Sequence, residues 1–207
     1  MPPLDTPQLL AIAAALGWAS GLRLYAVVFL TGLAGRLGWV ELPGGLVLLQ
    51  HPLMLSASGF MLFVEFFVDK IPGVDSLWDL VHTLVRIPAG AALAAAVFGA
   101  DPTAWTAAAA LRRSTLAATS HIAKTTTRAA VNTSPEPFSN VGMSLLGDAV
   151  VPAALWLSWA HPLLFAVLLA VALVAMVSAI WWLGRFLRQL AARMTGWRRP
   201  SLQRIEP

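Results

Sequence analysis

The chain has 207 residues, of which 58% are hydrophobic and only 12% are charged. Soluble domains contain about 45–50% apolar and about 25% charged residues, so this composition argues against a soluble domain and indicates a membrane protein. Cysteine is absent, which excludes disulfides and thiolate metal sites. The net charge of +4 does not indicate a nucleic-acid partner, because six of the fourteen basic residues lie in the last 23 positions, beside an apolar segment.

Apolar segments suited to membrane helices recur along the chain, and a full span needs roughly 20 apolar residues. We expect an all-α integral membrane protein with six transmembrane helices, at about residues 7–35, 52–69, 87–100, 103–123, 140–159 and 162–184. A five-span alternative makes residues 88–111 one helix kinked at Asp101-Pro102 and brings Arg112-Arg113 to the cytoplasm. Six spans are preferred because they put the acidic residues after the second span on the same side as Lys124 and Arg128.

The basic residues that follow the last span predict the orientation. Cytoplasmic segments carry an excess of Lys and Arg, and Trp181-Trp182 suits a membrane boundary. We therefore expect residues 1–190 to form a single helical transmembrane domain in the cell inner (cytoplasmic) membrane and residues 191–207 to form a basic cytoplasmic tail.

The first apolar segment is interrupted at Gly21-Leu22-Arg23. One interpretation is a single tilted helix whose arginine faces protein. The other is a helix broken at this point, with backbone that lines a cavity as in many transporters. Glycine makes such a break easy to form.

Residues 65–86 read EFFVDKIPGVDSLWDLVHTLVR and concentrate charge between apolar segments. Glu65 and Asp69 are four residues apart and share a helix face. Pro72-Gly73 then predicts a break, followed by a short amphipathic helix. On that helix Asp75, Asp79, His82 and Arg86 form one stripe. We expect these groups, with Lys70 and His121, to carry protons, balance charge or form ion pairs.

A second polar stretch, HIAKTTTRAAVNTSPEPFSN, covers residues 121–140. His121, Lys124 and Arg128 lie on one helix face, and the two prolines that follow predict an extended turn. Lys and Arg beside hydroxyl and amide groups suit a phosphate or another anion. The predicted anion-binding residues are Arg23, Lys124, Arg128, Asn132, Ser134, Glu136 and Asn140. A positively charged cytoplasmic loop is the alternative.

The aspartates also suggest a metal site. Asp75 and Asp79, with Asp69 nearby, could hold Mg²⁺, which prefers carboxylate oxygens and commonly bridges to substrate phosphates. The sequence requires no cofactor, and Mg²⁺ is the one that it leaves open. We found no nucleophile elbow, HExxH zinc motif, P-loop or dinucleotide fingerprint.

Three motifs, SGLRLY (20–25), EFFVDKIPGVDSLWDLVHTLVRIPAG (65–90) and KTTTRAAVNTSPEPFSN (124–140), resemble domain-of-unknown-function family 4126 of prokaryotic membrane proteins. The resemblance extends from about residue 10 to 185 and implies a helical membrane protein, without implying an activity. The family pattern carries a Glu-Asp pair after SPEPFSN, where this chain has Gly147-Asp148, so one carboxylate is missing.

Three functions remain open. The first is a small transporter or channel-like protein for an anionic or phosphate-bearing solute. The second is a Mg²⁺-dependent enzyme acting on a lipid-linked phosphate or diphosphate. The third is a non-catalytic membrane scaffold in which every charge is a structural pair and no pocket exists. The expected partners are the lipid bilayer and a small anionic ligand, with a homo-oligomer left open.

Overall fold

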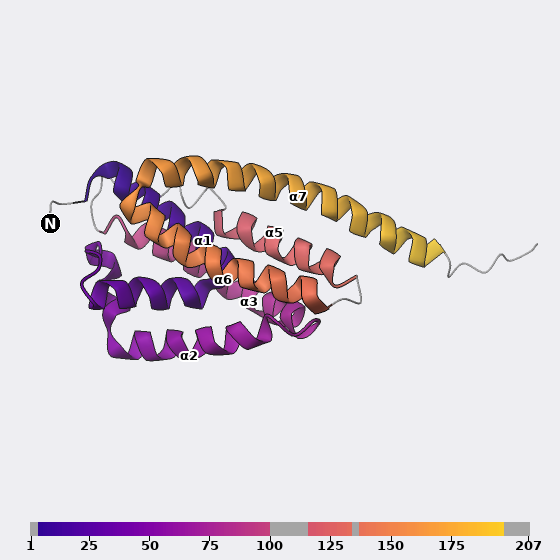
Figure 1. Cartoon of the computed structure of the whole chain (residues 1–207), viewed down its shortest axis with the longest axis horizontal. Helices are drawn as coiled ribbons and strands as arrows, with labels where there is room; N and C mark the ends of the chain where they lie inside the picture. Colours follow the sequence, from indigo (N-terminus) through magenta and orange to yellow (C-terminus); the bar gives the residue numbers. More distant parts are fainter. Residues whose placement is uncertain (1–3, 100–115, 134–136, 197–207) are drawn as a thin grey trace, which may run out of the picture.

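The computed structural model describes residues 4–99, 116–133 and 137–196, which are all helix, turn or loop. Figure 1 shows the helices packed side by side. Their bounds are α1 (Thr6–Arg36), the 3₁₀ helix η1 (Gly44–Gln50), α2 (Pro52–Val68), α3 (Val74–Ala96), α5 (Leu116–Val131), α6 (Pro137–Ala160) and α7 (Pro162–Gly196). The predicted all-α class is confirmed.

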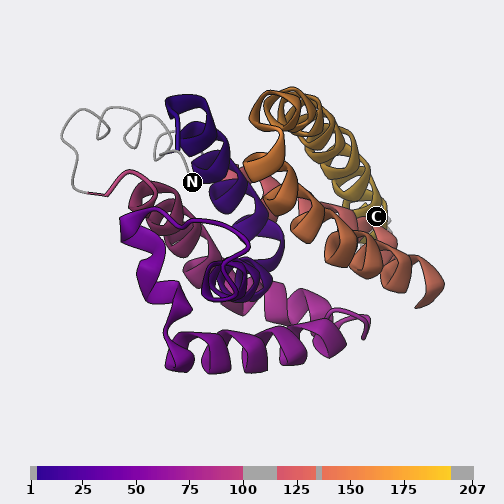
Figure 2. The ribbon, with the colours of Figure 1, turned by 60° about the vertical axis from the view of Figure 1, so that its left-hand side comes forward.

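Helix α1 folds back on itself at Arg23, whose backbone is not helical (φ −149°, ψ 87°). Gln8 and Thr31 would lie about 35 Å apart in a straight helix, at 1.5 Å per residue. Both nevertheless line one cavity at the end of the bundle where α1 begins. Of the two interpretations of Gly21-Leu22-Arg23, the broken helix is therefore the one present. Helix α1 consists of a first arm (residues 6–22) and a second arm (residues 24–36), whose outer ends lie at the same end of the bundle (Figures 1 and 2).

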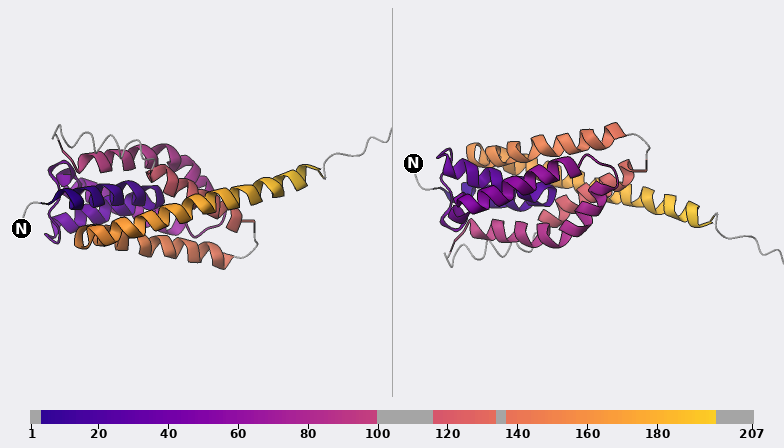
Figure 3. Two further views of the ribbon diagram at one scale, coloured as in Figure 1. Left: turned by 90° about the horizontal axis from the view of Figure 1, so that it is seen from above. Right: turned by 90° about the horizontal axis from the view of Figure 1, so that it is seen from below.

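The hairpin made by these two arms lies at the centre of the molecule. It packs against α2, α3, α5 and α6, with smaller contacts to α7. Several of its apolar side chains, among them Ile12, Leu16 and Val27, are fully buried, as is Val151 of α6. Helix α7 extends beyond the rest of the bundle at the opposite end (Figure 3), and it continues past residue 190, the predicted end of the transmembrane domain.

Among the described residues, α1, α6 and α7 are long and apolar enough to cross a membrane. A fourth candidate is the pair η1 and α2, which meet at 70°. The protein is therefore a multi-pass membrane protein with three to four candidate spans by length and hydropathy. The 31 residues of α1 do not measure the depth of membrane that it can cross, because its two arms are antiparallel. Asp101-Pro102 and Arg112-Arg113, which distinguish five from six spans, lie outside the described residues.

Helix α3 is longer than expected. The sequence predicted a short amphipathic helix followed by a separate span from residue 87, whereas one helix runs from Val74 to Ala96 with Pro88 inside it. Proline removes one backbone hydrogen bond, a loss that membrane helices tolerate when neighbouring groups compensate. The predicted break before α3 is present, and Gly73 adopts the left-handed φ of 86° there.

Helix α3 is also inside-out compared with a helix of a water-soluble protein. Its charged stripe faces inward, with Asp75 and Arg86 at 0% exposure. Its exposed face is apolar and includes Leu77, Leu80 and Leu84. Water favours the reverse arrangement, so this pattern indicates that the exposed face of α3 contacts lipid.

Candidate functional site

Ten charged side chains form one ion-pair network inside the helix bundle. The carboxylates are Glu65, Asp69, Asp75, Asp79 and Asp148, and the cations are Arg23, Lys70, Arg86, Lys124 and Arg128. Five negative and five positive groups balance one another. Burying charge in a bundle requires such partners, because unpaired ions in a low-dielectric interior are strongly disfavoured.

The two stripes predicted from the sequence meet in this network. Arg128 Nη1 lies 3.0 Å from both Asp69 and Asp79, and its Nε lies 3.8 Å from Asp75. Lys124 Nζ lies 3.2 Å from Asp69 and 3.1 Å from Asp79. The acidic residues around the α2–α3 connection and the basic face of α5 therefore hold these helices together.

The aspartates of the predicted magnesium site are engaged by an arginine. Asp69, Asp75 and Asp79 do converge, but they converge on the guanidinium of Arg128. In the described parts of the chain, no group of three or more His, Asp or Glu side chains is arranged to hold a metal ion. The sequence showed that the three aspartates are close along the chain, but it could not show that they converge in space or that Arg128, from a distant helix, lies among them.

Arg86 forms the most buried part of the network. Its guanidinium donates to Glu65 and to Asp79, and all three side chains are buried. Among the described residues, Glu65 Oε2 and Arg86 Nε have no hydrogen-bond partner. This end of the network is closed to solvent and contributes to structure more directly than to binding.

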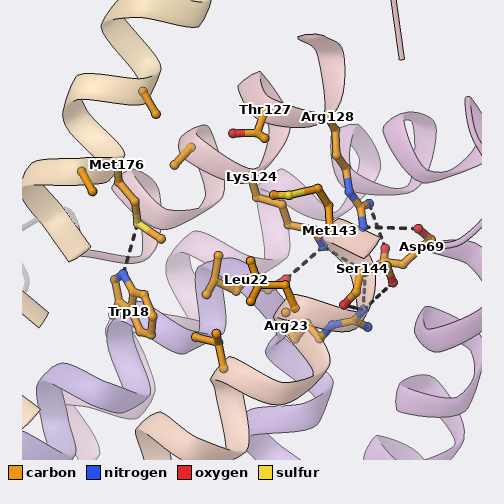
Figure 4. A pocket seen from close by; sticks show the side chains of 16 residues that line it. Trp18, Leu22, Arg23, Asp69, Lys124, Thr127, Arg128, Met143, Ser144 and Met176 are labelled. Carbon is orange, nitrogen blue, oxygen red and sulfur yellow. Dashed lines mark hydrogen bonds and ion pairs between the residues drawn. The ribbon is translucent and has the colours of Figure 1, made fainter. Parts of the chain in front are cut away.

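Arg23 joins the network at the α1 break. Its Nη2 lies 3.2 Å from Asp69 and 3.0 Å from Asp148, and it donates to the carbonyl and hydroxyl of Ser144 on α6. Arg23 is 2% exposed, and its Nη1 has no partner among the described residues. Figure 4 shows the guanidinium reaching toward Ser144 and Asp69.

Cations also stabilise the broken backbone. The last carbonyls of a helix have no partner within the helix, so the break leaves such groups in the interior. Lys124 Nζ donates to the Leu22 carbonyl at 3.0 Å. The Ser120 hydroxyl donates to the Trp18 carbonyl at 2.6 Å. A lysine at a helix C-terminus also suits the helix dipole. Helix α5 thus completes the hairpin.

A cavity of about 300 Å³ lies against this network, between α1, α5, α6 and α7. Its polar wall contains Arg23, Asp69, Lys124, Thr127, Arg128 and Ser144. The remaining wall is largely apolar and contains Trp18, Leu22, Ala123, Met143, Leu146, Val150, Ala175, Met176 and Ala179. Three of the predicted anion-binding residues therefore line one cavity, together with one of the predicted acidic residues.

Other predicted site residues lie elsewhere. Asn132 donates to Asp75 and Ser76 at the start of α3. His82 stacks on Trp78, and His121 contacts the Thr83 hydroxyl. Asn140 is 1% exposed on α6, and its amide has no partner among the described residues.

Ser134 and Glu136, two of the predicted anion-binding residues, lie outside the described residues. Asp148 was absent from the predicted site residues, although it bonds Arg23 and Lys70. Only its place beside Gly147 in the family pattern drew attention to it.

The sequence of the chain matches the family model described as Domain of unknown function (DUF4126) over residues 10–182. The chain belongs to this family. No curated protein and no solved structure matches it. The DUF4126 match covers the hairpin from residue 10 on, both charged stripes and the cavity, so the whole network lies within the family domain.

Gly147, which precedes Asp148, lies on the cavity wall. A Cβ atom at this position would lie 3.4 Å from Arg23 Nε. The absence of a side chain therefore leaves space beside the guanidinium that has an unpartnered nitrogen.

Proposed function

We propose that this protein is a small membrane transporter or channel-like protein for an anionic or phosphate-bearing solute. The observation that carries the proposal is the cavity at the α1 break, whose polar wall presents Arg23, Lys124 and Arg128. Interrupted helices at the centre of a bundle provide solute sites in many transporters, since their backbone groups and side chains are already organised around a cavity.

The ion pairs suggest how binding could be coupled to movement. Two carboxylates already pair with Arg23: Asp69, the C-terminal cap of α2, and Asp148 on α6. An oxyanion that bonds Arg23 competes with these carboxylates and weakens the links between the hairpin and the two helices. The binding energy of the solute then shifts the balance between two arrangements of the same bundle.

The proposal includes a membrane topology. We place the protein in the inner membrane with the end of α7 in the cytoplasm, because the basic residues follow that end. Helices α2, α3, α5, α6 and α7 cross the bilayer, and α1 enters from the outer face and returns to it.

The cavity distinguishes this proposal from the two alternatives. A scaffold requires no cavity, whereas one of about 300 Å³ adjoins the network. The magnesium-dependent enzyme requires three aspartates free to bind the metal, and Arg128 occupies them. Both observations favour solute binding by the cations.

Counterflow uptake in proteoliposomes tests the proposal. Liposomes preloaded with phosphate, acetate or butyl phosphate are diluted into a trace of the same labelled solute. We expect uptake above that of protein-free liposomes for at least one of these anions. In Arg23→Gln this uptake should fall at least tenfold. Arg36→Gln is the matched control, since Arg36 is exposed at the far end of the second arm and bonds Gln50 there. Wild-type uptake equal to that of protein-free liposomes, or an equal loss of uptake in both variants, would contradict the proposal.

A further inference from the structure

We infer that the solute is an amphiphilic anion, with one phosphate or carboxylate group on a single apolar chain. This inference rests on the proposed function and specifies the solute for the same cavity. Its basis is that the cavity has two chemically different ends (Figure 4).

The charged end is built to receive an oxyanion. Arg23 is 2% exposed and lines the cavity, and its Nη1 has no hydrogen-bond partner in the part of the chain that the structure describes. Lys124 and Arg128 lie on the same wall. Beside Arg23, Gly147 contributes no side chain, and a Cβ there would lie 3.4 Å from Nε. An oxygen of the solute can use this space to accept from the guanidinium, which suits carboxylate and phosphate geometry.

The other end of the cavity suits hydrocarbon. Figure 4 shows Trp18 and Met176 at the end away from Arg128 and Asp69, and the Trp18 indole donates to the Met176 sulfur at 3.3 Å. This interaction satisfies the one polar group of Trp18. The rest of the wall is largely hydrocarbon, with the Thr127 hydroxyl as a polar exception. The polar groups of a hydrophilic solute would therefore lose water there without gaining hydrogen bonds in exchange.

The rim of the cavity is apolar as well. Met143 and Leu146 on α6 line the cavity and are 38% and 56% exposed. Ala175 on α7 lines it and is also exposed. In a membrane protein, exposed apolar side chains contact lipid, so this opening faces hydrocarbon and admits an amphiphile from the bilayer. A volume of about 300 Å³ is at the small end of the range for ligand pockets, about 300–1,000 Å³, and therefore favours one short chain over two acyl chains.

Calorimetric titration tests the inference. The protein in lipid nanodiscs is titrated with phosphate and with ethyl, butyl and hexyl phosphate, and the heats of the same titrations into protein-free nanodiscs are subtracted. Each methylene that enters the cavity should tighten Kd by about fourfold, since burying one contributes about 0.8 kcal/mol. Inorganic phosphate should bind at least tenfold more weakly than butyl phosphate. Equal affinity for the two would overturn the inference and identify a site for free phosphate.

Two pairs of variants localise the binding. Ala179→Trp fills the cavity and should abolish the dependence on chain length, whereas Ala170→Trp, at an exposed position on the same helix, should preserve it. Gly147→Glu places a tethered carboxylate beside Arg23 and should weaken hexyl phosphate at least tenfold, and Gly147→Gln should weaken it less. A chain-length dependence unchanged by Ala179→Trp would mean that the alkyl chain binds elsewhere, which also overturns the inference.

The two proposals fail separately. Tightening with chain length in a protein that gives no counterflow uptake would retain the amphiphile site and reject transport. Uptake of phosphate with no effect of chain length on binding would retain transport and reject the amphiphile.

Discussion

The pairing of Arg86 with Glu65 illustrates, at the scale of single residues, how this protein tolerates charge in an apolar bundle. Both side chains are 0% exposed, and among the described residues Glu65 has no ion-pair partner other than Arg86. Asp79, the second partner of Arg86, also contacts Lys124 and Arg128. Removing Arg86 therefore leaves Glu65 as the least compensated charge of the network.

Arg86→Met should destabilise the protein by about 3–5 kcal/mol, because removing one partner of a buried pair leaves the other charge buried and unpaired. The double variant Glu65→Leu with Arg86→Met should recover most of this loss, since apolar residues often replace buried ion pairs at little cost. The free energies of unfolding of both single variants, Arg86→Met and Glu65→Leu, and of the double variant are measured by tryptophan fluorescence in one detergent. If the loss in the double variant equals the sum of the two single losses, the pair is not the isolated unit that its contacts indicate.

The hairpin α1 is the element on which the site depends, and close backbone contact holds it in place. A Cβ at Gly21 would lie 2.0 Å from Ser120 Oγ and 2.2 Å from the Ala117 carbonyl oxygen. Glycine is required here for space, because the first arm and α5 approach too closely for any side chain. Small residues have the same use in other membrane helix pairs.

Gly21→Ala should therefore separate the first arm from α5 and displace Lys124 from the Leu22 carbonyl, at a cost of about 2–4 kcal/mol, in the range of overpacked or strained positions. Gly142→Ala is the matched control on α6, where a Cβ meets nothing within 4 Å. It should be neutral or stabilising by up to about 1 kcal/mol, because alanine favours helix. Unfolding midpoints of the two variants in the same detergent provide the measurement, and equal midpoints would show that the contact at Gly21 is not tight.

At the scale of the whole molecule, the sequence predicts the class and part of the network. The composition predicts a helical membrane protein, and spacings of three and four predict that Asp75, Asp79 and Arg86 share a face. The fold-back at Arg23 could not be derived, because a single Gly-Leu-Arg interruption suits a tilted helix equally well. The bonds from Arg23 to Asp148 could not be derived either, since they join residues 125 positions apart through packing alone.

The fold-back of α1 determines whether the beginning of the chain and the loop after α1 lie on the same side of the membrane. If α1 crossed the membrane once, its beginning and the loop after it would lie on opposite faces. In the structure the two arms return to one end of the bundle, and α7 ends at the other (Figures 1 and 3). A reporter near the start of α1 and one in the loop after it should therefore respond from the same side of the membrane.

The chain has no cysteine, so single cysteines can report each side without a background. Thr6→Cys and Trp39→Cys lie at exposed positions at the two ends of α1, and Gln189→Cys is exposed on the last part of α7. We expect an impermeant maleimide added to intact cells to label Thr6→Cys and Trp39→Cys, and to label Gln189→Cys only after the cells are opened. A single crossing by α1 would instead give Thr6→Cys the behaviour of Gln189→Cys. Labelling of all three variants in denatured protein controls for expression. The labelling pattern then separates a re-entrant hairpin from an ordinary first span, and only the hairpin places Arg23 at mid-depth beside the cavity.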